Sequence, residues 1–318
     1  MGQKRKVRVY LGIKQPTTKE IEQYRERYAF TLESRAAMKK AEISSLCYKT
    51  KYLDLEKAKN IEYIKYLYQT FTSLLTTDEI QAYEQNFEIN YIQGTTSIEG
   101  NTLSLSQTSD LLLNGLTPIG KALREINEVQ NFKQVKTYRD KYRGKITLDF
   151  IKTIHMLIMN NIDLVTAGEF RRIDIIGIAG CDLMVTPAAL IEEELQKAID
   201  EYYESLNNIW HPFEAAALFH YKFEMIHPFT DGNGRVGREI FNCMLTRLGY
   251  PRLLFLGSDR QRYIESLQHG NKDEYAKMIW IFADLIFQQR YHVLTENLEK
   301  VVIPAKKTGQ QRLQDFFL

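Results

Sequence analysis

Residues 225–245 read MIHPFTDGNGRVGREIFNCML. An apolar helix is expected to end near Ile226, and the loop that follows contains His227 and Asp231. A Gly-Asn-Gly run then leads into a second, amphipathic helix. Glycine lets backbone amides approach a phosphate closely, and a helix N-terminus adds free N–H donors and the positive end of its dipole. The stretch therefore predicts an anion-binding loop between two helices.

Four side chains around this loop suit phosphate chemistry. Arg235 and Arg238 are three residues apart, so they share one helix face and can bind phosphate oxygens with forked donors. Asp231 supplies an oxygen ligand of the kind that Mg²⁺ prefers. His227 is the nearby group whose ordinary pKa lets it act as a base at neutral pH. For each residue taken singly, a capped helix turn with a core histidine is the simpler alternative.

Apolar residues recur at spacings of three and four over most of the chain, which predicts a mainly α fold. The segments with this pattern are 53–75, 80–87, 106–113, 121–143, 148–161 and most of 188–301. Thr17 and Glu20 form a capping box that starts a further long helix. Gly94 to Asn101 are predicted to form a turn and a short polar element, and KVRVYLGI at residues 6–13 a short strand.

One segment departs from the helical pattern. Residues 170–187 read FRRIDIIGIAGCDLMVTP, an apolar β-branched run, a turn signal and a second short apolar run before a proline. This order predicts a β-hairpin.

The composition is that of an ordinary folded soluble chain, with 318 residues, 44% hydrophobic, 26% charged and a net charge of +2. That length slightly exceeds what one core usually needs, so an appendage to a main domain is expected. Residues 1–60 hold 15 Lys and Arg against 7 Asp and Glu, a net charge of +8 that leaves −6 for the rest. A solvated, lysine-rich helix face is the favoured explanation, and contact with nucleic acid or an acidic partner is the alternative.

The cysteines and the apolar runs bear on the compartment. Cys47, Cys181 and Cys243 show no zinc-ligand spacing, which indicates a reducing compartment, the cytoplasm or the nucleus, and no structural metal. No apolar run reaches the roughly 18 to 20 residues that cross a bilayer, and the first residues lack a signal peptide's apolar stretch. We therefore expect no membrane association.

The loop resembles the signature HxFx(D/E)GNGRxxR of the Fic family of nucleotidyl transferases. All eight fixed positions match: His227, Phe229, Asp231, Gly232, Asn233, Gly234, Arg235 and Arg238. The resemblance covers about residues 90–295. It implies a Fic-type helical core with a short β-hairpin flap at about residues 172–185. It also implies an enzyme, a protein adenylyltransferase that transfers AMP from ATP to a Ser, Thr or Tyr hydroxyl of a target protein.

The same resemblance implies roles for the residues that meet the acceptor and the metal. His227 would deprotonate the attacking hydroxyl. Asp231 would hold the Mg²⁺ that bridges the α- and β-phosphates. The flap would position a segment of the target protein by strand addition.

Roles on the phosphates follow in the same way. Asn233 and the amides around Gly232 and Gly234 would hold the α-phosphate as charge develops there. Arg235 would bind the departing pyrophosphate, and Arg238 would bind the γ-phosphate.

A second motif, Thr95, Glu99 and Gly100, fits the family's inhibitory pattern (S/T)xxxE(G/N) in an inhibitory helix at about residues 95–101. A carboxylate that pairs with Arg238 removes the cation meant for the γ-phosphate and repels ATP, so we expect self-inhibition. A surface helix cap is the alternative for so short a pattern. In this class the same glutamate can also orient a water that removes AMP, so de-AMPylation stays open. A homo-oligomer is possible, because inhibition in this family often depends on oligomeric state.

Two residues further along resemble the tyrosine and asparagine that family members place near adenine. They are Tyr263 and Asn271, eight residues apart and so on nearly one helix face. Ile264 stands where the family often has a second tyrosine.

The last residues form a separate signal. Gln310, Leu313, Phe316 and Phe317 match QxxΦxxaa, the peptide by which replication and repair proteins bind a sliding DNA clamp (PCNA). One turn of tight helix puts the three apolar side chains on one side, while Gln310 bonds at the rim. Docking of the tail on its own domain is the alternative. If the clamp is the main partner, the chain could be an adaptor with little catalysis.

These observations divide the chain into three parts. Residues 1–85 form a basic helical N-terminal region, residues 86–297 the Fic domain, and residues 298–318 a tail whose clamp-binding-like peptide is 310–318.

Overall fold

The computed structural model describes residues 6–13, 15–174 and 185–302. Within these ranges the chain is mainly α-helical and forms no β-sheet, and a single isolated bridge joins Lys49 and Trp210. The predicted mainly α fold is confirmed. No helix within these ranges is both long enough and apolar enough to cross a membrane.

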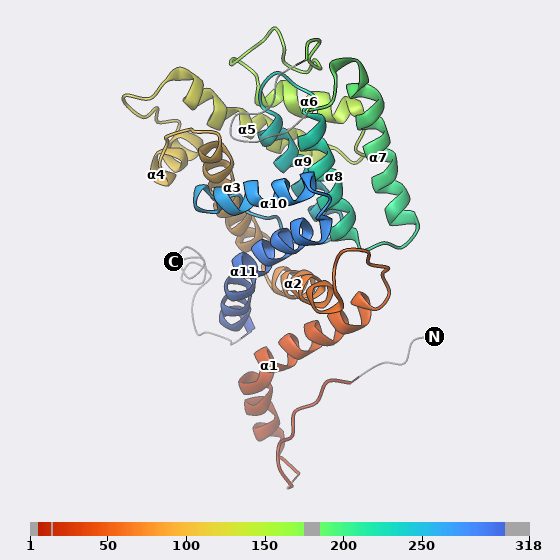
Figure 1. Cartoon of the computed structure of the whole chain (residues 1–318). Helices are drawn as coiled ribbons and strands as arrows, with labels where there is room; N and C mark the ends of the chain where they lie inside the picture. The colour runs from red at the N-terminus through yellow and green to blue at the C-terminus, as the bar shows by residue number, and fades with distance from the viewer. Residues whose placement is uncertain (1–5, 14, 175–184, 303–318) are drawn as a thin grey trace.

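The two N-terminal helices pack with the last described helix. The helices are α1 (Thr18–Ser45), α2 (Leu55–Ser73) and α11 (Tyr275–Val302), and α1 extends away from the rest of the molecule (Figure 1). The capping box predicted at the start of α1 is confirmed, since Thr17 and Glu20 bond reciprocally. A small core between these helices includes Leu67, Phe71 and Leu294.

The strand predicted at residues 6–13 is wrong, because none of them is in a strand. Tyr10 is 79% exposed and Ile13 is 97% exposed. An alternating pattern forms a strand only where a neighbouring strand or a packing surface can cover one face.

The remaining helices consist of a central pair, α8 (Pro212–Ile226) and α9 (Asn233–Arg247), and the helices around it. The helices around it are α3 (Thr77–Ile98), α4 (Leu105–Ser109) with a π-helical turn (Asp110–Asn114), α5 (Leu123–Lys141), α6 (Leu148–Ile158), α7 (Ile191–Asn207) and α10 (Arg260–Asn271). Short 3₁₀ turns, Ala188–Leu190 and Gly257–Asp259, precede α7 and α10.

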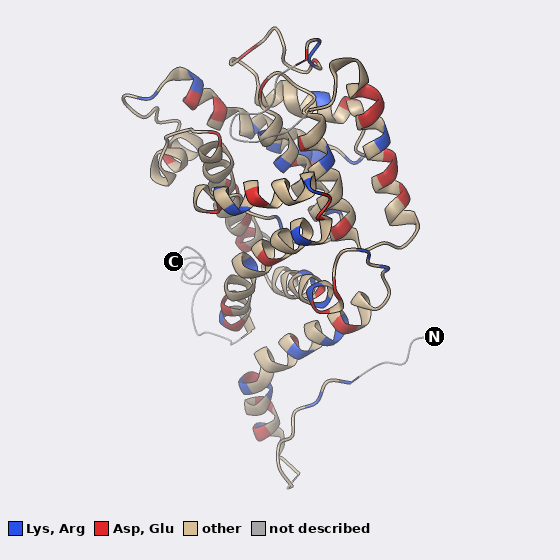
Figure 2. Cartoon of the chain, viewed as in Figure 1, with Lys and Arg blue, Asp and Glu red and all other residues tan. Residues whose placement is uncertain are grey.

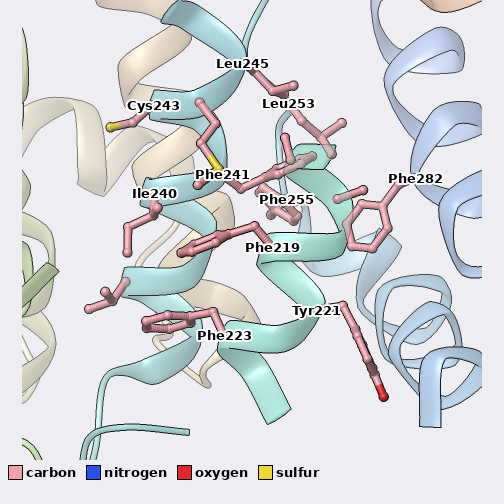
Figure 3. Close-up of a cluster of buried hydrophobic side chains, with 14 of the residues drawn as sticks. Phe219, Tyr221, Phe223, Ile240, Phe241, Cys243, Leu245, Leu253, Phe255 and Phe282 are labelled. Carbon is pink, nitrogen blue, oxygen red and sulfur yellow. The ribbon is translucent and has the colours of Figure 1, made fainter. Parts of the chain in front are cut away.

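The central pair is α8 and α9, which pack through large apolar side chains. Figure 3 shows Phe219 and Phe223 of α8 beside Ile240 and Phe241 of α9, with Phe282 of α11 completing the cluster. All five are buried. Burial on this scale fixes the two helices relative to each other, and with them the loop of residues 227–232 that connects them.

The turn predicted at Gly94 to Asn101 is wrong in its first half, because α3 continues to Ile98. The predicted inhibitory helix at 95–101 is therefore the last turn of α3, with Glu99 as its C-cap and Gly100 in the left-handed region at φ +97°. Gly94 is needed for packing: a Cβ there would lie 2.4 Å from the carbonyl oxygen of Phe255. A glycine that permits close approach and one that makes a turn look alike in sequence.

A buried carboxylate connects the N-terminal part to α8, one of the two helices that the loop joins. Glu214 of α8 accepts hydrogen bonds from the backbone N–H groups of Lys51, Tyr52 and Leu53 at 3.0–3.2 Å. The charges are unevenly distributed over the described residues. Acidic side chains are frequent along α7, whereas the described start of the chain is basic (Figure 2).

Candidate active site

His227 is held in an unusual backbone conformation at the end of α8. Its φ and ψ are 48° and 62°, the left-handed region that glycine usually occupies, and its N–H donates to the carbonyl of Phe223 at 3.0 Å. Strained non-glycine residues of this kind cluster at functional positions. Burial lowers the pKa of His227 to about 4, and the positive charge of Arg171 acts in the same direction. The imidazole is therefore neutral at pH 7, the form that a general base requires.

The loop after His227 is fixed by two internal contacts. Phe229 is fully buried and stacks on His155, with 3.7 Å between the ring centroids. Asn233 accepts a hydrogen bond from the N–H of Phe229 at 2.9 Å and donates one to its carbonyl at 2.7 Å. Both ends of the Asn233 amide are thus used within the loop. The donors left for an α-phosphate are chiefly the backbone N–H groups of the first turn of α9.

The two glycines of the loop serve different purposes. Gly232 is the N-cap of α9 at φ +78°, a conformation that L side chains rarely adopt. Gly234 lies inside the first turn, where a Cβ would stand 2.4 Å from a carboxylate oxygen of Glu99 and 2.8 Å from a guanidinium nitrogen of Arg238. The missing side chain at Gly234 therefore leaves the space in which Glu99 and Arg238 meet.

Arg238 is almost completely buried, at 1% exposure, and it is bonded to the end of α3. Its Nε donates to the Thr95 hydroxyl at 2.8 Å, and its Nη2 donates to the Thr95 carbonyl at 2.9 Å and to Glu99 Oε1 at 2.7 Å. Burial acts to raise the pKa of Glu99, but the charge of Arg238 outweighs it and the net pKa is lowered. Glu99 is therefore ionised, and the pair is a charge-assisted one.

Arg235 and Asp231 form the other end of the loop. Arg235 is 2% exposed, and its two terminal nitrogens lie 3.2 Å from Asp231 Oδ1 and 3.2 Å from Glu128 Oε1. Its buried Nε has no hydrogen-bond partner among the described residues. The second oxygen of Asp231 pairs with Arg124, and these two side chains are 42% and 56% exposed.

Asp231 is the one predicted metal ligand of this site. The described residues contain no group of three or more His, Cys, Asp or Glu that could hold a metal ion. Burial acts to raise the pKa of Asp231, but Arg235 and the N–H of Gly232 outweigh it, so the carboxylate stays ionised. Mg²⁺ is typically bound by one or two carboxylates together with substrate phosphates and waters. The residues present therefore fit an ion that arrives with a nucleotide.

Residues 145–245, which include this loop, match the family model described as Fic/DOC family. This part of the chain is similar to a Fic domain. Among curated proteins, it is 34% identical over 186 residues to protein adenylyltransferase fic-1 of Caenorhabditis elegans, covering 57% of this chain and 36% of that protein. It is 32% identical over 209 residues to protein adenylyltransferase Fic of Aedes aegypti, covering 63% and 40%. The match thus spans less than half the length of these relatives.

Solved structures also resemble the chain. A fragment of Fic-1 from C. elegans superposes with a TM-score of 0.66 at 28% identity, covering 74% of this chain and 71% of the fragment. A Fic domain containing signaling protein from Bacteroides thetaiotaomicron superposes with a TM-score of 0.66 at 23% identity, covering 77% of this chain and 99% of that one. The second likeness shows the fold alone.

The two predicted adenine contacts lie at opposite ends of α10. Tyr263 is 5% exposed, its ring lies 5.8 Å from the Arg238 guanidinium, and its hydroxyl bonds to His220 at 3.1 Å. So buried a ring leaves little surface for an adenine to contact. Asn271 accepts a hydrogen bond from Tyr221 at 3.2 Å. A role of either residue at adenine stays a prediction.

Two predicted features fall outside the described residues. The hairpin at about 172–185 is described only at its two ends, because residues 175–184 lie outside. The tail residues Gln310, Leu313, Phe316 and Phe317 also lie outside.

One residue that supports the Fic loop was missed by sequence reasoning. His155 of α6 accepts a hydrogen bond on Nδ1 from the N–H of Gly168 at 2.8 Å, so its proton resides on Nε2, which bonds to the Asp231 carbonyl at 3.0 Å. His155 therefore connects Asp231, the predicted metal ligand, to the segment that leads to the expected flap. It lies within an apolar helical pattern, 72 residues before His227, and nothing in its spacing signals the contact.

Proposed function

We propose that the chain is a Mg²⁺-dependent protein adenylyltransferase that uses ATP and is inhibited by its own Glu99. The observation that carries this proposal is the arrangement at the start of α9: a neutral His227, unpaired backbone donors and two buried arginines converge on one loop. The adenylyltransferase names of the curated relatives support the same activity.

In the proposed reaction, a Ser, Thr or Tyr hydroxyl of the target attacks the α-phosphorus of ATP. The new bond joins the hydroxyl oxygen to phosphorus, and the bond to the bridging oxygen of the β-phosphate breaks, releasing pyrophosphate. His227 takes the hydroxyl proton. The amides at the start of α9 stabilise the charge on the α-phosphate, and Arg235 that on the pyrophosphate. Mg²⁺, held by Asp231 and the phosphates, would neutralise phosphate charge.

Self-inhibition would act at Arg238. Its guanidinium is the expected partner of the γ-phosphate, and Glu99 already accepts a hydrogen bond from it at 2.7 Å. ATP must displace this carboxylate or bind without its γ-phosphate contact. Either course weakens productive binding, because a charge-assisted hydrogen bond contributes about 1.5–3 kcal/mol.

Labelling with radioactive ATP and Mg²⁺ tests the proposal. Glu99→Gly should raise the transfer of AMP to protein sharply, and His227→Ala in that background should abolish it. His292→Ala is the matched control, because His292 is exposed on α11 and remote in sequence from the loop. If Glu99→Gly and His227→Ala both behave like wild type, the mechanism is wrong.

Net removal of AMP from a modified protein is the second candidate activity. It is favoured by the ionised state of Glu99, since a carboxylate beside the phosphate site can orient and deprotonate a water. Release of AMP from a labelled target by wild type, but not by the Glu99→Gly variant, would support it. An adaptor with little catalysis would show neither labelling nor release.

We further propose a partner for the tail, on the spacing of Gln310, Leu313, Phe316 and Phe317 alone. Binding of the full chain to a sliding clamp should weaken strongly when Phe316→Ala and Phe317→Ala are combined. Absent or unchanged binding would remove this partner.

A further inference from the structure

Arg171 is a buried cation between the expected flap and the catalytic loop. It is 4% exposed and lies in the segment that runs from α6 to the flap. Its Nη1 donates to the carbonyl of Ile173 at 2.9 Å, and its Nη2 donates to the carbonyl of Thr186. Ile173 and Thr186 lie on either side of the segment 175–184, so one guanidinium bonds the described backbone before that segment and after it.

The same side chain also bonds the catalytic loop. Its Nε donates to the carbonyl of His227 at 2.9 Å, and its Nη2 lies 3.4 Å from the carbonyl of Ile226. The backbone N–H of Arg171 donates to the carbonyl of Pro228 at 2.9 Å. Arg171 therefore contacts three consecutive residues around the candidate base, whose backbone conformation is itself strained.

A second contact joins the described residues before and after the segment 175–184. The carboxylate of Asp174 accepts a hydrogen bond from the N–H of Ala188 at 2.7 Å. The same carboxylate lies 3.8 Å from the Arg171 guanidinium, and it is 75% exposed, so it compensates the buried charge only weakly.

The geometry of the guanidinium donors explains why an arginine occupies this buried position, although burying a charge is unfavourable. Burial lowers the pKa of Arg171, because a site shielded from water disfavours a charge. A guanidinium offers five N–H donors in one rigid plane, and it is the side chain that can bond four carbonyls from three separate stretches of backbone. A lysine ammonium has three donors at a single atom, so it cannot span the same set.

We propose that Arg171 is a positioning residue for the transfer step. By bonding the backbone around His227 to Ile173 and Thr186, it holds the imidazole in the place where it can take the proton of the target's hydroxyl. This inference rests on the proposed adenylyltransferase activity. A misplacement of about 1 Å between reacting groups can slow a reaction about 100-fold.

The test compares Arg171→Gln, Arg171→Lys and the control Arg25→Gln, all combined with Glu99→Gly. Arg25 is an exposed arginine of α1. Calorimetry measures the affinity and stoichiometry of ATP binding, and labelling at saturating ATP measures turnover. We expect Arg171→Gln to lower turnover about 100-fold, Arg171→Lys to recover part of the loss, and Arg25→Gln to change nothing. ATP affinity and stoichiometry should stay constant in all three, because no predicted phosphate ligand is altered.

Hydrogen exchange provides a readout that needs no activity. The backbone N–H at position 171 donates to Pro228, and that of Thr186 donates to Met225 at 3.3 Å. Both amides should exchange faster in Arg171→Gln, and amides within α9 should not. Unchanged exchange and turnover would overturn the inference, as would loss of ATP binding in step with turnover, which indicates a merely structural role. A Glu99→Gly parent that labels no protein would instead refute the proposed function, and exchange would still test the contact.

Discussion

The two ends of the candidate phosphate-binding loop are occupied in different ways. At the Arg238 end, a guanidinium with 1% exposure donates two hydrogen bonds to the buried Thr95 and one to Glu99, whose side chain is 37% exposed. At the Asp231 end, the carboxylate pairs with Arg124 through side chains that are 42% and 56% exposed. Exposed ion pairs contribute about 0–1 kcal/mol, whereas a buried donor that loses its acceptor costs about 1–3 kcal/mol. Control of nucleotide binding should therefore be concentrated at the Arg238 end.

The largest expected effect is on stability at the buried end. Thr95→Val keeps the shape of the side chain but leaves the Nε of Arg238 buried without its acceptor. We expect the free energy of unfolding to fall by about 1.5–3 kcal/mol, measured by urea denaturation. Thr96→Val is the matched control, since Thr96 is similarly buried but its hydroxyl donates within its own helix, to the carbonyls of Ile92 at 2.8 Å and Gln93 at 3.2 Å. Equal losses in the two variants would show that Thr95 does not hold Arg238.

A smaller effect is expected at the exposed end. Arg124→Gln removes the exposed one of the two cations that pair with Asp231, and the buried Arg235 stays in place. Calorimetric titration of Mg²⁺ and ADP together should show a tightening of less than about fivefold, because the pair is exposed. A change well above tenfold would mean that the exposed end also controls binding, and the contrast between the two ends would then fail.

The smallest expected effect is on the pH titration of His227, whose NMR signals should stay constant. Burial lowers the pKa of His227 to about 4 from an ordinary value of 6.5. A histidine whose pKa is lowered remains neutral above that value, so its ring signals in NMR should not change between about pH 5 and pH 8. His227→Ala assigns the signals. A midpoint near 6.5 would show that the imidazole is fully solvated rather than desolvated.

The sequence predicted most of the helices and the composition of the loop, because both follow from local rules. Apolar spacing marks α2, α5, α6 and α9, and the capping box at Thr17 and Glu20 marks the start of α1. Gly94 was misread since its purpose, a close approach to Phe255, involves a residue far along the chain. The alternating pattern at residues 6–13 predicted a strand, but the described residues contain no neighbouring strand with which it could pair.

Residues that support the site were harder to predict than residues that line it. His155 and Arg171 act through backbone carbonyls of the loop. Because every residue has a backbone carbonyl, the sequence does not show which carbonyls accept these bonds. The side chain of Asn233 was expected at the α-phosphate, but it bonds to Phe229 within the loop. Contacts of this kind are set by the three-dimensional course of the backbone, which spacing alone does not give.

The affinities of ATP and ADP for wild type and for the Glu99→Gly variant test the central claim most directly. If Glu99 occupies the partner of the γ-phosphate, its removal should tighten ATP binding at least about tenfold, the equivalent of one charge-assisted hydrogen bond. ADP has no γ-phosphate, so its affinity should change little. Equal ATP affinity in the two proteins, or an equal gain for ADP, would contradict the account.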